Sequence, residues 1–564
     1  MKRAIALGVI LLVHFALLAP WVHSDMGSFD ATHFYFPTAR AFLEQGWSFL
    51  GDERSIHAPI LSWLWPLAWG LSPDAMRVGH AVMSGFTLLM VFRAAAILHS
   101  PAAGLWAAAL FALSPLLRPW LSAPITEAPT LFLCALWIWS VAQAWQGRRL
   151  RWILVGGAAL GTAALFRATV FSAIVAIVVV AGIAWFRARG VARRTAGRIA
   201  VAYLLALVPA ALLIGKNLLL FHFGFFATGG GNALYLGVNP LTGGYDPSYM
   251  ALGYDVGAIA RDQSHLTLEA ERLLGGVAHL IYAQTDVAVL ARRFLEKSAA
   301  FVFVTSAEQD ALLQRSWRIA TLVLALAGLL FARARPVAWA LGAMLAYQFV
   351  VHVPALYTHR YSVGALDLWL TIAAGVGIAC ILEGRFRVAA AMGMTAVIAT
   401  GCAMGFVAWR DLGRPMPDVE AAPRLTAWTV ATDIRLDRGH PEAELAIDAR
   451  QWFRDWNNHV LVMDARHDGA PWSPDCTSLQ VSFRRAGHAD FSPSMAFRRH
   501  AGEGWHRYEL GTLPLEMAAE GTLRLRWACA TPFQIHNLHL VAALGPVDFR
   551  AQLLHEAPLL PAQR

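Results

Sequence analysis

The sequence predicts a mainly α-helical polytopic membrane protein with a β-rich, sandwich-like domain at its C-terminal end. Of its 564 residues, 57% are hydrophobic and only 15% are charged, a composition typical of membrane-embedded chains. Apolar runs long enough to cross a hydrocarbon core of about 30 Å recur before Trp409 and stop after it. We therefore expect a transmembrane domain at residues 1–410 and a soluble domain at residues 411–564.

The apolar runs predict about eleven transmembrane helices and two large outer loops, at about residues 22–74 and 221–315. The helices are expected at residues 4–22, 75–98, 102–120, 126–145, 152–166, 168–186, 199–220, 316–332, 336–354, 361–382 and 388–409. Residues 4–22 also resemble a signal peptide, but their length favours an uncleaved first helix.

Basic residues predict the orientation of these helices. The net charge of +9 is carried mostly by arginine, and the arginines cluster in the connections of one side, such as 148–151 and 187–198. The positive-inside rule places that side in the cytoplasm, which explains the basic charge without nucleic-acid binding. An odd number of spans then puts the C-terminal domain outside the cytoplasm, with the chain in the cell inner (plasma) membrane.

The first outer loop continues with a short segment that is rich in tryptophan and proline, at residues 57–72. This segment is too short to span, and we expect an interfacial helix that holds Trp63, Trp65 and Trp69 at the level of the lipid headgroups.

The second outer loop opens with glycine and asparagine and ends with a helical pattern. Residues 228–245 carry the small residues of turns and are expected to form a binding loop, whereas residues 255–297 show amphipathic helical periodicity.

The C-terminal domain shows short segments of alternating polar and apolar residues between turns, which predict antiparallel strands. It also contains Cys476 and Cys529, for which we expect a disulfide if the domain is exported.

Candidate site residues gather on the predicted outer side. Asp30 follows the first span and is a carboxylate at the membrane edge, where it can act as a base towards an acceptor that arrives from water. Glu127 opens the fourth span after Thr126, a pattern that is also typical of helix capping. Cations that suit a phosphate group occur nearby in the predicted topology: His57, Arg167, His359 and Arg360.

These motifs resemble those of the C-type polytopic glycosyltransferases, the superfamily of the protein O-mannosyltransferases (family 39) and the lipid A aminoarabinose transferases. The resemblance rests on five separated places in the family's order. They are Asp30 with Tyr35 and Ala39-Arg40, His57-Ala58-Pro59, Thr126-Glu127 with Arg167, Asn239-Pro240 to Gly243-Gly244-Tyr245, and His359-Arg360-Tyr361. Ala31 stands where the family usually has a second acid.

The resemblance implies a hexosyl- or pentosyltransferase that uses a polyprenyl-phosphate sugar donor and an extracytoplasmic acceptor, which is a lipid, a glycan or a protein. Asp30 would be the general base and Glu127 a second catalytic residue. The donor phosphate would be held by His57, Arg167, His359 and Arg360, and the substrate loop residues would be Tyr35, Arg40, Asn239, Tyr245 and Tyr361.

Two other classes of function stay open at this point. A transporter or flippase of lipid-linked glycans would need paired charges inside its spans. A non-catalytic envelope scaffold with a glycan-binding tail would explain the missing acid at Ala31. No cysteine and histidine set has zinc-ligand spacing, but a divalent cation bound by Asp30 and Glu127 is also an open alternative.

Overall fold

The computed structural model divides the chain into two compact units. The first comprises Met1–Thr228, Ser298–Val353 and Tyr357–Gly405, and the second comprises Gly229–Lys297, Pro354–Leu356 and Phe406–Arg564. The structure describes residues 2–24, 30–147, 149–238, 266–284, 287–303, 312–355, 366–383, 426–447, 458–467, 478–485, 489, 491, 495–498, 504–509, 521–527, 529 and 531–543.

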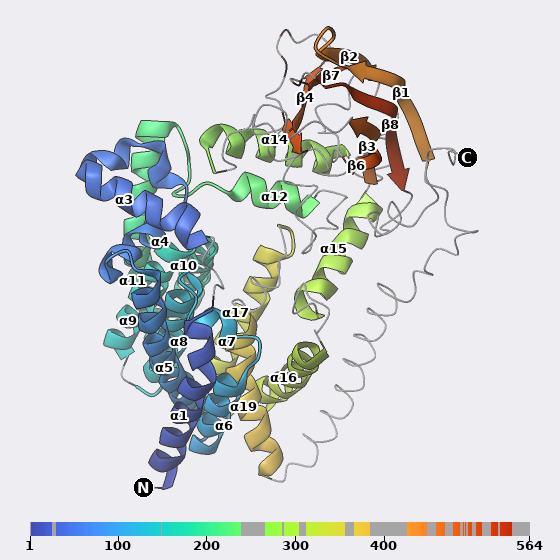
Figure 1. The fold of residues 1–564 in the computed structure, drawn as a ribbon. Helices are drawn as coiled ribbons and strands as arrows, with labels where there is room; N and C mark the ends of the chain where they lie inside the picture. The colour runs from blue at the N-terminus through green and yellow to red at the C-terminus, as the bar shows by residue number, and fades with distance from the viewer. Residues whose placement is uncertain are drawn as a thin grey trace. The chain divides into compact units, whose positions relative to one another are not determined.

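The first unit is a bundle of apolar helices (Figure 1). Its long members are α1 (Lys2–Val22), α5 (Pro73–Leu98), α6 (Pro101–Leu113), α8 (Glu127–Trp145), α9 (Arg149–Phe166), α10 (Thr169–Arg187), α11 (Gly190–Phe221), α16 (Leu312–Phe331), α17 (Arg335–His352) and α19 (Leu368–Leu382). Within the described residues, six helices are long and apolar enough to cross a membrane, and α6, α9 and α19 are shorter apolar helices. The predicted class, a helical multi-pass membrane protein, is thereby confirmed.

Most predicted helix boundaries hold to within a few residues. Helix α11 differs, because it begins at Gly190, nine residues before the predicted start at residue 199, and α19 begins at Leu368, whereas its span was predicted from residue 361. The span expected at residues 102–120 ends at Leu113, because Ser114 leaves the helical conformation and Pro115 follows it. A short helix, α7 (Arg118–Leu121), occupies part of the remainder. The last predicted span, residues 388–409, lies outside the described residues.

Glycine residues allow the helices of this bundle to approach closely. A Cβ atom on Gly328 of α16 would lie 1.8 Å from the Ala373 carbonyl oxygen of α19, and one on Gly377 of α19 would lie 2.1 Å from the Leu324 carbonyl oxygen. Small residues at helix contacts are typical of membrane proteins, in which dispersion forces rather than water exclusion hold helices together.

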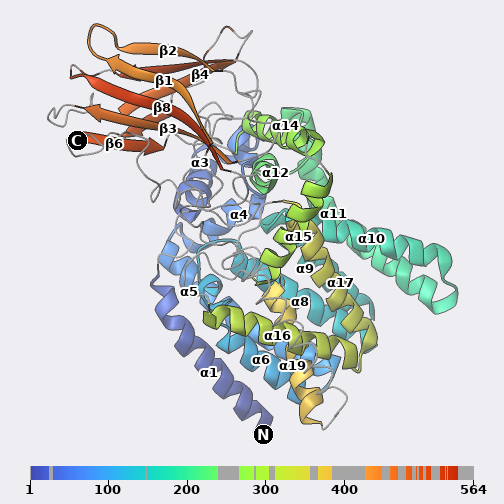
Figure 2. The same ribbon diagram turned by 90° about the vertical axis from the view of Figure 1, so that its right-hand side faces the viewer.

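The connected ends of helices α10 and α11 project from the bundle as a hairpin (Figure 2), whereas Ala202 and Ala206 of α11 pack against α9. Large apolar side chains are exposed along both of them, including Val180 at 66% and Leu212 at 70%. Such surfaces are stable in hydrocarbon and not in water, so this hairpin is consistent with a lipid-facing position.

The segment after α1 folds into short helices on the bundle. They are the π-helix η1 (Ala31–Tyr35), α3 (Phe36–Gln45), η2 (Gly46–Gly51), η3 (Glu53–Ile56), α4 (Ile60–Leu64) and η4 (Trp65–Trp69). The predicted interfacial helix is thus two short ones. The Trp63 side chain is 1% exposed and packs against Phe42 and Phe49, so its indole contacts protein rather than lipid headgroups.

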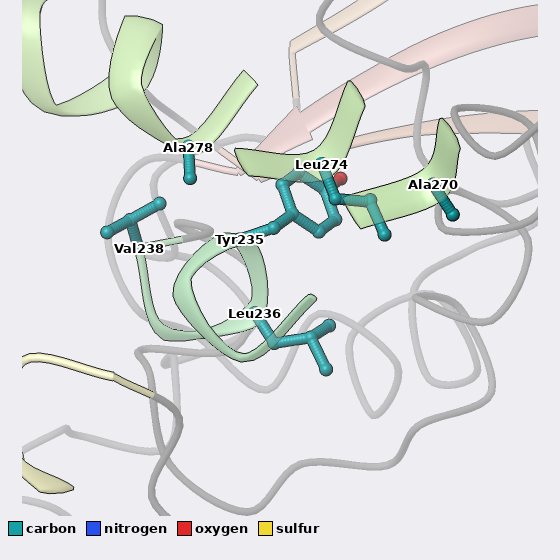
Figure 3. Close-up of a cluster of buried hydrophobic side chains, with 6 residues drawn as sticks. All are labelled: Tyr235, Leu236, Val238, Ala270, Leu274 and Ala278. Atoms are coloured by element: carbon teal, nitrogen blue, oxygen red, sulfur yellow. The ribbon is translucent and has the colours of Figure 1, made fainter. Parts of the chain in front are cut away.

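The second unit contains α12 (Gly230–Val238) and α14 (Leu268–Gln284), and α15 (Val287–Phe303) begins in it. Tyr235 and Leu236 of α12 pack against Ala270 and Leu274 of α14 in a small apolar cluster (Figure 3). The Glu271 carboxylate accepts hydrogen bonds from the amides of Gly229 and Gly231 at 2.7 and 2.9 Å, which caps α12. Residues 230–238 are therefore a capped helix, not the loop that we predicted.

The same unit contains two four-stranded antiparallel sheets, as the alternating pattern predicted. One has the order β1-β8-β3-β6 and the other β2-β7-β4-β5. The strands are β1 (Thr426–Leu436), β2 (Glu442–Ile447), β3 (Asn458–His467), β4 (Ser478–Arg485), β5 (Met495–Arg498), β6 (Gly504–Glu509), β7 (Gly521–Trp527) and β8 (Phe533–Ala543). Both sheets contribute fully buried residues, among them Ala465, Leu525 and Phe533.

We expect Gly328→Ala to destabilise the bundle by about 1–3 kcal/mol, because the added methyl group collides with the backbone of α19 and the helices must separate. Gly182→Ala on α10 is the matched control, since nothing lies within 4 Å of a Cβ atom there. Thermal unfolding of the two purified variants measures the difference. Equal melting temperatures would show that α16 and α19 are not packed as described.

The structure describes one of the two cysteines of the predicted disulfide, Cys529. Cys529 is disulfide-bonded, Cys134 and Cys380 are free thiols, and Cys402 and Cys476 lie outside the described residues. We expect Cys476→Ser to free the Cys529 thiol and to lower the free energy of unfolding by up to about 4 kcal/mol, because the bridge is lost. Cys402→Ser is the control and should leave Cys529 in its disulfide. Peptide mass spectrometry of unreduced protein from cells gives the answer, and a Cys402–Cys529 link would contradict the prediction.

Candidate active site

Glu127 and Arg167, which the sequence predicted separately, form an ion pair in the structure. The Arg167 Nη1 and Glu127 Oε1 atoms are 3.5 Å apart. The Glu127 side chain is only 1% exposed, whereas that of Arg167 is 15% exposed. Glu127 lies in the first turn of α8, where the helix dipole also stabilises a negative charge. The pair therefore places a buried carboxylate next to a guanidinium that reaches the edge of the bundle.

The segment before Glu127 is held by a histidine that sequence reasoning missed. The buried His80 of α5 donates from Nδ1 to the Ala123 carbonyl oxygen at 2.7 Å. Its Nε2 accepts from the Trp65 indole at 2.9 Å. These roles require the neutral imidazole with its proton on Nδ1. His80 thus links the Trp65 helix η4 to the turn that starts α8.

Thr126 occupies the N-cap position of α8, as predicted, but its side chain makes no capping hydrogen bond. Its carbonyl oxygen instead accepts from the Thr130 hydroxyl at 2.6 Å. Capping by Thr126 therefore does not explain the Thr-Glu pair, and the contact with Arg167 does more to hold Glu127.

Arg167 is positioned by the short connection between α9 and α10. The Ser62 hydroxyl donates to the Phe166 carbonyl oxygen at 2.9 Å, and the Trp65 ring meets the Phe166 ring edge-on at 5.6 Å. On the other side, the Tyr347 hydroxyl of α17 donates to the Thr169 carbonyl oxygen. His352, at the end of α17, interacts electrostatically with Arg167. Two separate parts of the chain, the segment with Ser62 and Trp65 and the helix α17, therefore contact this turn.

His57 lies at the end of η3 in a segment tied to α11. Lys216 donates to the Leu50 carbonyl oxygen and the Ser55 hydroxyl at 3.0 and 3.1 Å, and the Thr228 amide donates to the Ile56 carbonyl oxygen at 2.8 Å. Burial lowers the pKa of His57, despite Glu53 at 3.8 Å. The lowered pKa favours the neutral form of the His57 imidazole, which can still form hydrogen bonds.

Asp30 is half-buried and immediately precedes the π-helix η1, a conformation that is frequent at functional sites. Its carboxylate does not cap that helix. Tyr35 ends η1 and packs with Trp65 and Trp69 against the buried side chains of Ala31, Phe36 and Met76. The Trp65 indole thus touches both the Asp30 segment and, through His80, the Glu127 segment. Arg40 is exposed on α3.

Ala31 is 0% exposed within this apolar cluster. A glutamate at this position would have to be buried among Phe36 and Met76, at a cost of several kcal/mol if it were ionised. Packing therefore accounts for the absence of the second acid.

The remaining predicted site residues lie outside the described residues. They are Asn239, Tyr245, His359, Arg360 and Tyr361. Asp25, a second acid at the same membrane edge that could be the base in place of Asp30, lies outside them as well.

A second buried ion pair was not predicted from the sequence. Arg318 of α16 donates from Nε and Nη2 to the two oxygens of Asp367 at 2.8 and 2.6 Å, and both side chains are almost fully buried. Arg318 also donates to the carbonyl oxygens of Phe301 and Val302 at 3.5 and 3.2 Å. Its charge and most of its donors are thus used within the bundle, which indicates a structural role.

No group of three or more His, Cys, Asp or Glu residues in the described part of the chain could hold a metal ion. One charged partner of the Glu127 carboxylate is Arg167, at 3.5 Å. The divalent cation stays an open alternative, and the mechanism below uses none.

The fold and the buried pair define a polytopic membrane protein with an ionisable site at the ends of its helices. Residues 56–214 match the family model of dolichyl-phosphate-mannose-protein mannosyltransferase. The matched segment contains His57, Glu127 and Arg167 and excludes Asp30. The resemblance to the C-type glycosyltransferases is thereby confirmed over this part of the chain.

No curated protein sequence matches the chain. Among solved structures, an oligosaccharyltransferase of Archaeoglobus fulgidus in the apo form is 14% identical with a TM-score of 0.40, over 71% of this chain and 56% of its own. The same organism's AglB, in complex with an inhibitory peptide and a dolichol-phosphate, is 13% identical with a TM-score of 0.40, over 73% and 56%. ArnT from Cupriavidus metallidurans bound to undecaprenyl phosphate is 15% identical with a TM-score of 0.29, over 74% and 81%. The chain thus spans little more than half the length of the archaeal enzyme.

We expect Arg167→Gln to destabilise the protein more than the double variant Glu127→Gln, Arg167→Gln. The single change removes the Arg167 charge from beside the buried Glu127 carboxylate, which costs up to about 3–5 kcal/mol, whereas the double change removes both charges. Thermal unfolding of the wild type, the two single variants and the double variant gives a double-mutant cycle, which measures the coupling free energy between Glu127 and Arg167. If the double variant lost as much as the two single variants together, Glu127 and Arg167 would not be coupled.

Proposed function

We propose that the chain is a glycosyltransferase that moves one sugar from a polyprenyl-phosphate donor to an acceptor outside the cytoplasm. The observation that carries the proposal is the Glu127–Arg167 pair, which lies inside the segment that matches a lipid-phosphate-dependent transferase family. The orientation with the N-terminus in the cytoplasm and the location in the inner membrane are part of the proposal. They rest on the distribution of arginine.

In the proposed reaction the acceptor hydroxyl attacks the anomeric carbon of the donor sugar. Its proton passes to the Asp30 carboxylate as the new glycosidic bond forms. The bond between the anomeric carbon and the phosphate oxygen breaks, and the phosphate leaves with the bonding electrons. Attack from the face opposite the phosphate inverts the configuration of the sugar carbon. A phosphate monoester is a good leaving group, so it needs positive charge more than a proton donor.

Arg167 is the described residue best suited to hold that phosphate. It is partly exposed, and its contact with Glu127 is long at 3.5 Å, so a phosphate oxygen can compete for the guanidinium. His57 would add a neutral hydrogen bond, while His359 and Arg360 are proposed as further phosphate ligands from the sequence alone. Glu127 would hold Arg167 in place and orient the acceptor.

The first experiment identifies whether the acceptor is a lipid, a glycan or a protein. We expect envelope lipids, glycans or proteins from cells with the chain to carry a hexose or pentose mass increment that is missing from cells without it. Mass spectrometry of the three fractions makes this comparison. Identical spectra in all three fractions would count against a transferase and favour the transporter or the scaffold.

Given that product, we expect Asp30→Asn to reduce its formation by about 10²–10⁴-fold, because asparagine cannot accept the acceptor's proton. Asp25→Asn is the matched control in the same segment and should cost much less, and Glu127→Gln should fall between the two. Product formation is measured at equal protein levels. Near-normal turnover in Asp30→Asn with an inactive Asp25→Asn would move the base to Asp25.

A further inference from the structure

The outer face of the sheet β1-β8-β3-β6 carries a row of planar side chains around one tryptophan. Arg435 of β1 lies opposite Gln534 of β8, Gln534 lies opposite Arg466 of β3, and Arg466 lies opposite Trp505 of β6. Directly paired residues point to the same face of a sheet. Their neighbours Ile535 and Ala465 are 1% and 0% exposed, so the row points away from the core.

A second polar pair lies two residues further along the same strands. The His536 Nδ1 and Asp433 Oδ1 atoms are 2.8 Å apart, and the side chains are 35% and 75% exposed. The Trp505 ring contacts the His536 ring at 5.7 Å in an edge-on arrangement. Tryptophan, histidine and aspartate are thus joined on one exposed surface.

The backbone is irregular where this surface is formed. The pairing of β8 with β3 passes from Asn537–Asp464 to Ile535–Ala465, which leaves His536 as the extra residue of a β-bulge. Asp433, its neighbour on β1, has a φ angle of 54°. A bulge changes the direction of a side chain, and such bulges are frequent beside binding sites. Here the bulge turns His536 towards Asp433 and Trp505.

The outer face of the other sheet is different. There Glu444 pairs with Arg524 at 2.7 Å and Glu442 with Arg526 at 3.3 Å. The aromatic ring of that face, Phe491, lies beneath the guanidinium groups of Arg524 and Arg484 at 3.6 and 4.5 Å. In the described part of this face, Glu442 and Glu444 are paired across the strands and the Phe491 ring is covered, so these residues do not offer an open platform.

We propose that the Trp505 face is a binding site for a neutral glycan chain of pyranose residues. The indole would stack on the apolar face of a sugar ring. Gln534, His536 and Asp433 would exchange hydrogen bonds with its hydroxyl groups.

The charges on this face select that class of ligand. Arg435 and Arg466 carry two positive charges, and Asp433 and Asp437 carry two negative ones, with Arg435 3.3 Å from Asp437, so the charges named on this face balance. An anionic polymer would require an excess of positive charge. A protein partner would favour a core with few charged side chains, which this row of Arg, Gln, Asp and His does not provide.

The test uses the full chain in lipid nanodiscs, because maltoside or glucoside detergents would compete for the site. Maltohexaose, cellohexaose and mannohexaose serve as probes, and titrations followed by saturation-transfer NMR give their affinities. We expect at least one of them to bind. Trp505→Ala should weaken that binding by at least about tenfold, which corresponds to loss of about 1.4 kcal/mol of stacking.

Two further variants separate recognition from folding. Trp505→Phe keeps a ring and should retain most of the binding, whereas Gln534→Ala should weaken it while the melting temperature stays the same. Arg526→Gln on the other sheet is the control and should bind as the wild type does. Binding of none of the three probes by the wild type, or equal binding by Trp505→Ala, would overturn the proposal. Neither result depends on transferase activity.

Discussion

The buried carboxylate of Glu127 requires a positive charge nearby, and the ends of the neighbouring helices are arranged so that Arg167 provides it. A carboxylate at 1% exposure in an apolar bundle is unstable unless a positive charge and helix dipole offset its desolvation. Arg167 provides the charge and the first turn of α8 provides the dipole. Arg167 can do so because α9 ends at Phe166 and α10 begins at Thr169, which leaves it in a turn beside α8.

The segment from Asp30 to Trp69 is fixed to the bundle by polar contacts near this pair. Ser62 bonds to the α9–α10 turn, Trp65 bonds to His80, and Lys216 bonds to the backbone at Leu50. Each contact joins a short helix to a long one, so the catalytic candidates are held by the rigid bundle rather than by loop structure alone. Preorganisation of this kind is what charge stabilisation in a transition state requires.

Sequence reasoning found the elements that periodicity and motifs encode and missed those that depend on distant partners. The apolar runs predicted the helices, and Glu127 and Arg167 were both recognised as candidates from their positions at helix ends. Their contact could not be inferred, because it joins residues 40 positions apart in the chain. His80 and Arg318 carried no signal, since a single polar residue in an apolar run looks the same whether it is paired or not. Residues 230–238 were predicted as a loop from their glycines, but Glu271, far along the chain, caps them as a helix.

The positions of the two buried ion pairs in the described residues are compatible with the proposed transferase. A transporter of charged lipid-linked glycans would need ionisable groups near the middle of its spans, where alternating access exposes them to each side in turn. Glu127 instead lies at the beginning of α8 and Asp367 at the beginning of α19, while Arg167 follows the end of α9. Arg318 is held by two carboxylate oxygens and two backbone carbonyls, so releasing it during a transport cycle would be costly. Arg318 lies inside α16, but Glu127 and Arg167 lie at helix ends, where they would be close to the membrane surface at which the proposed donor and acceptor meet.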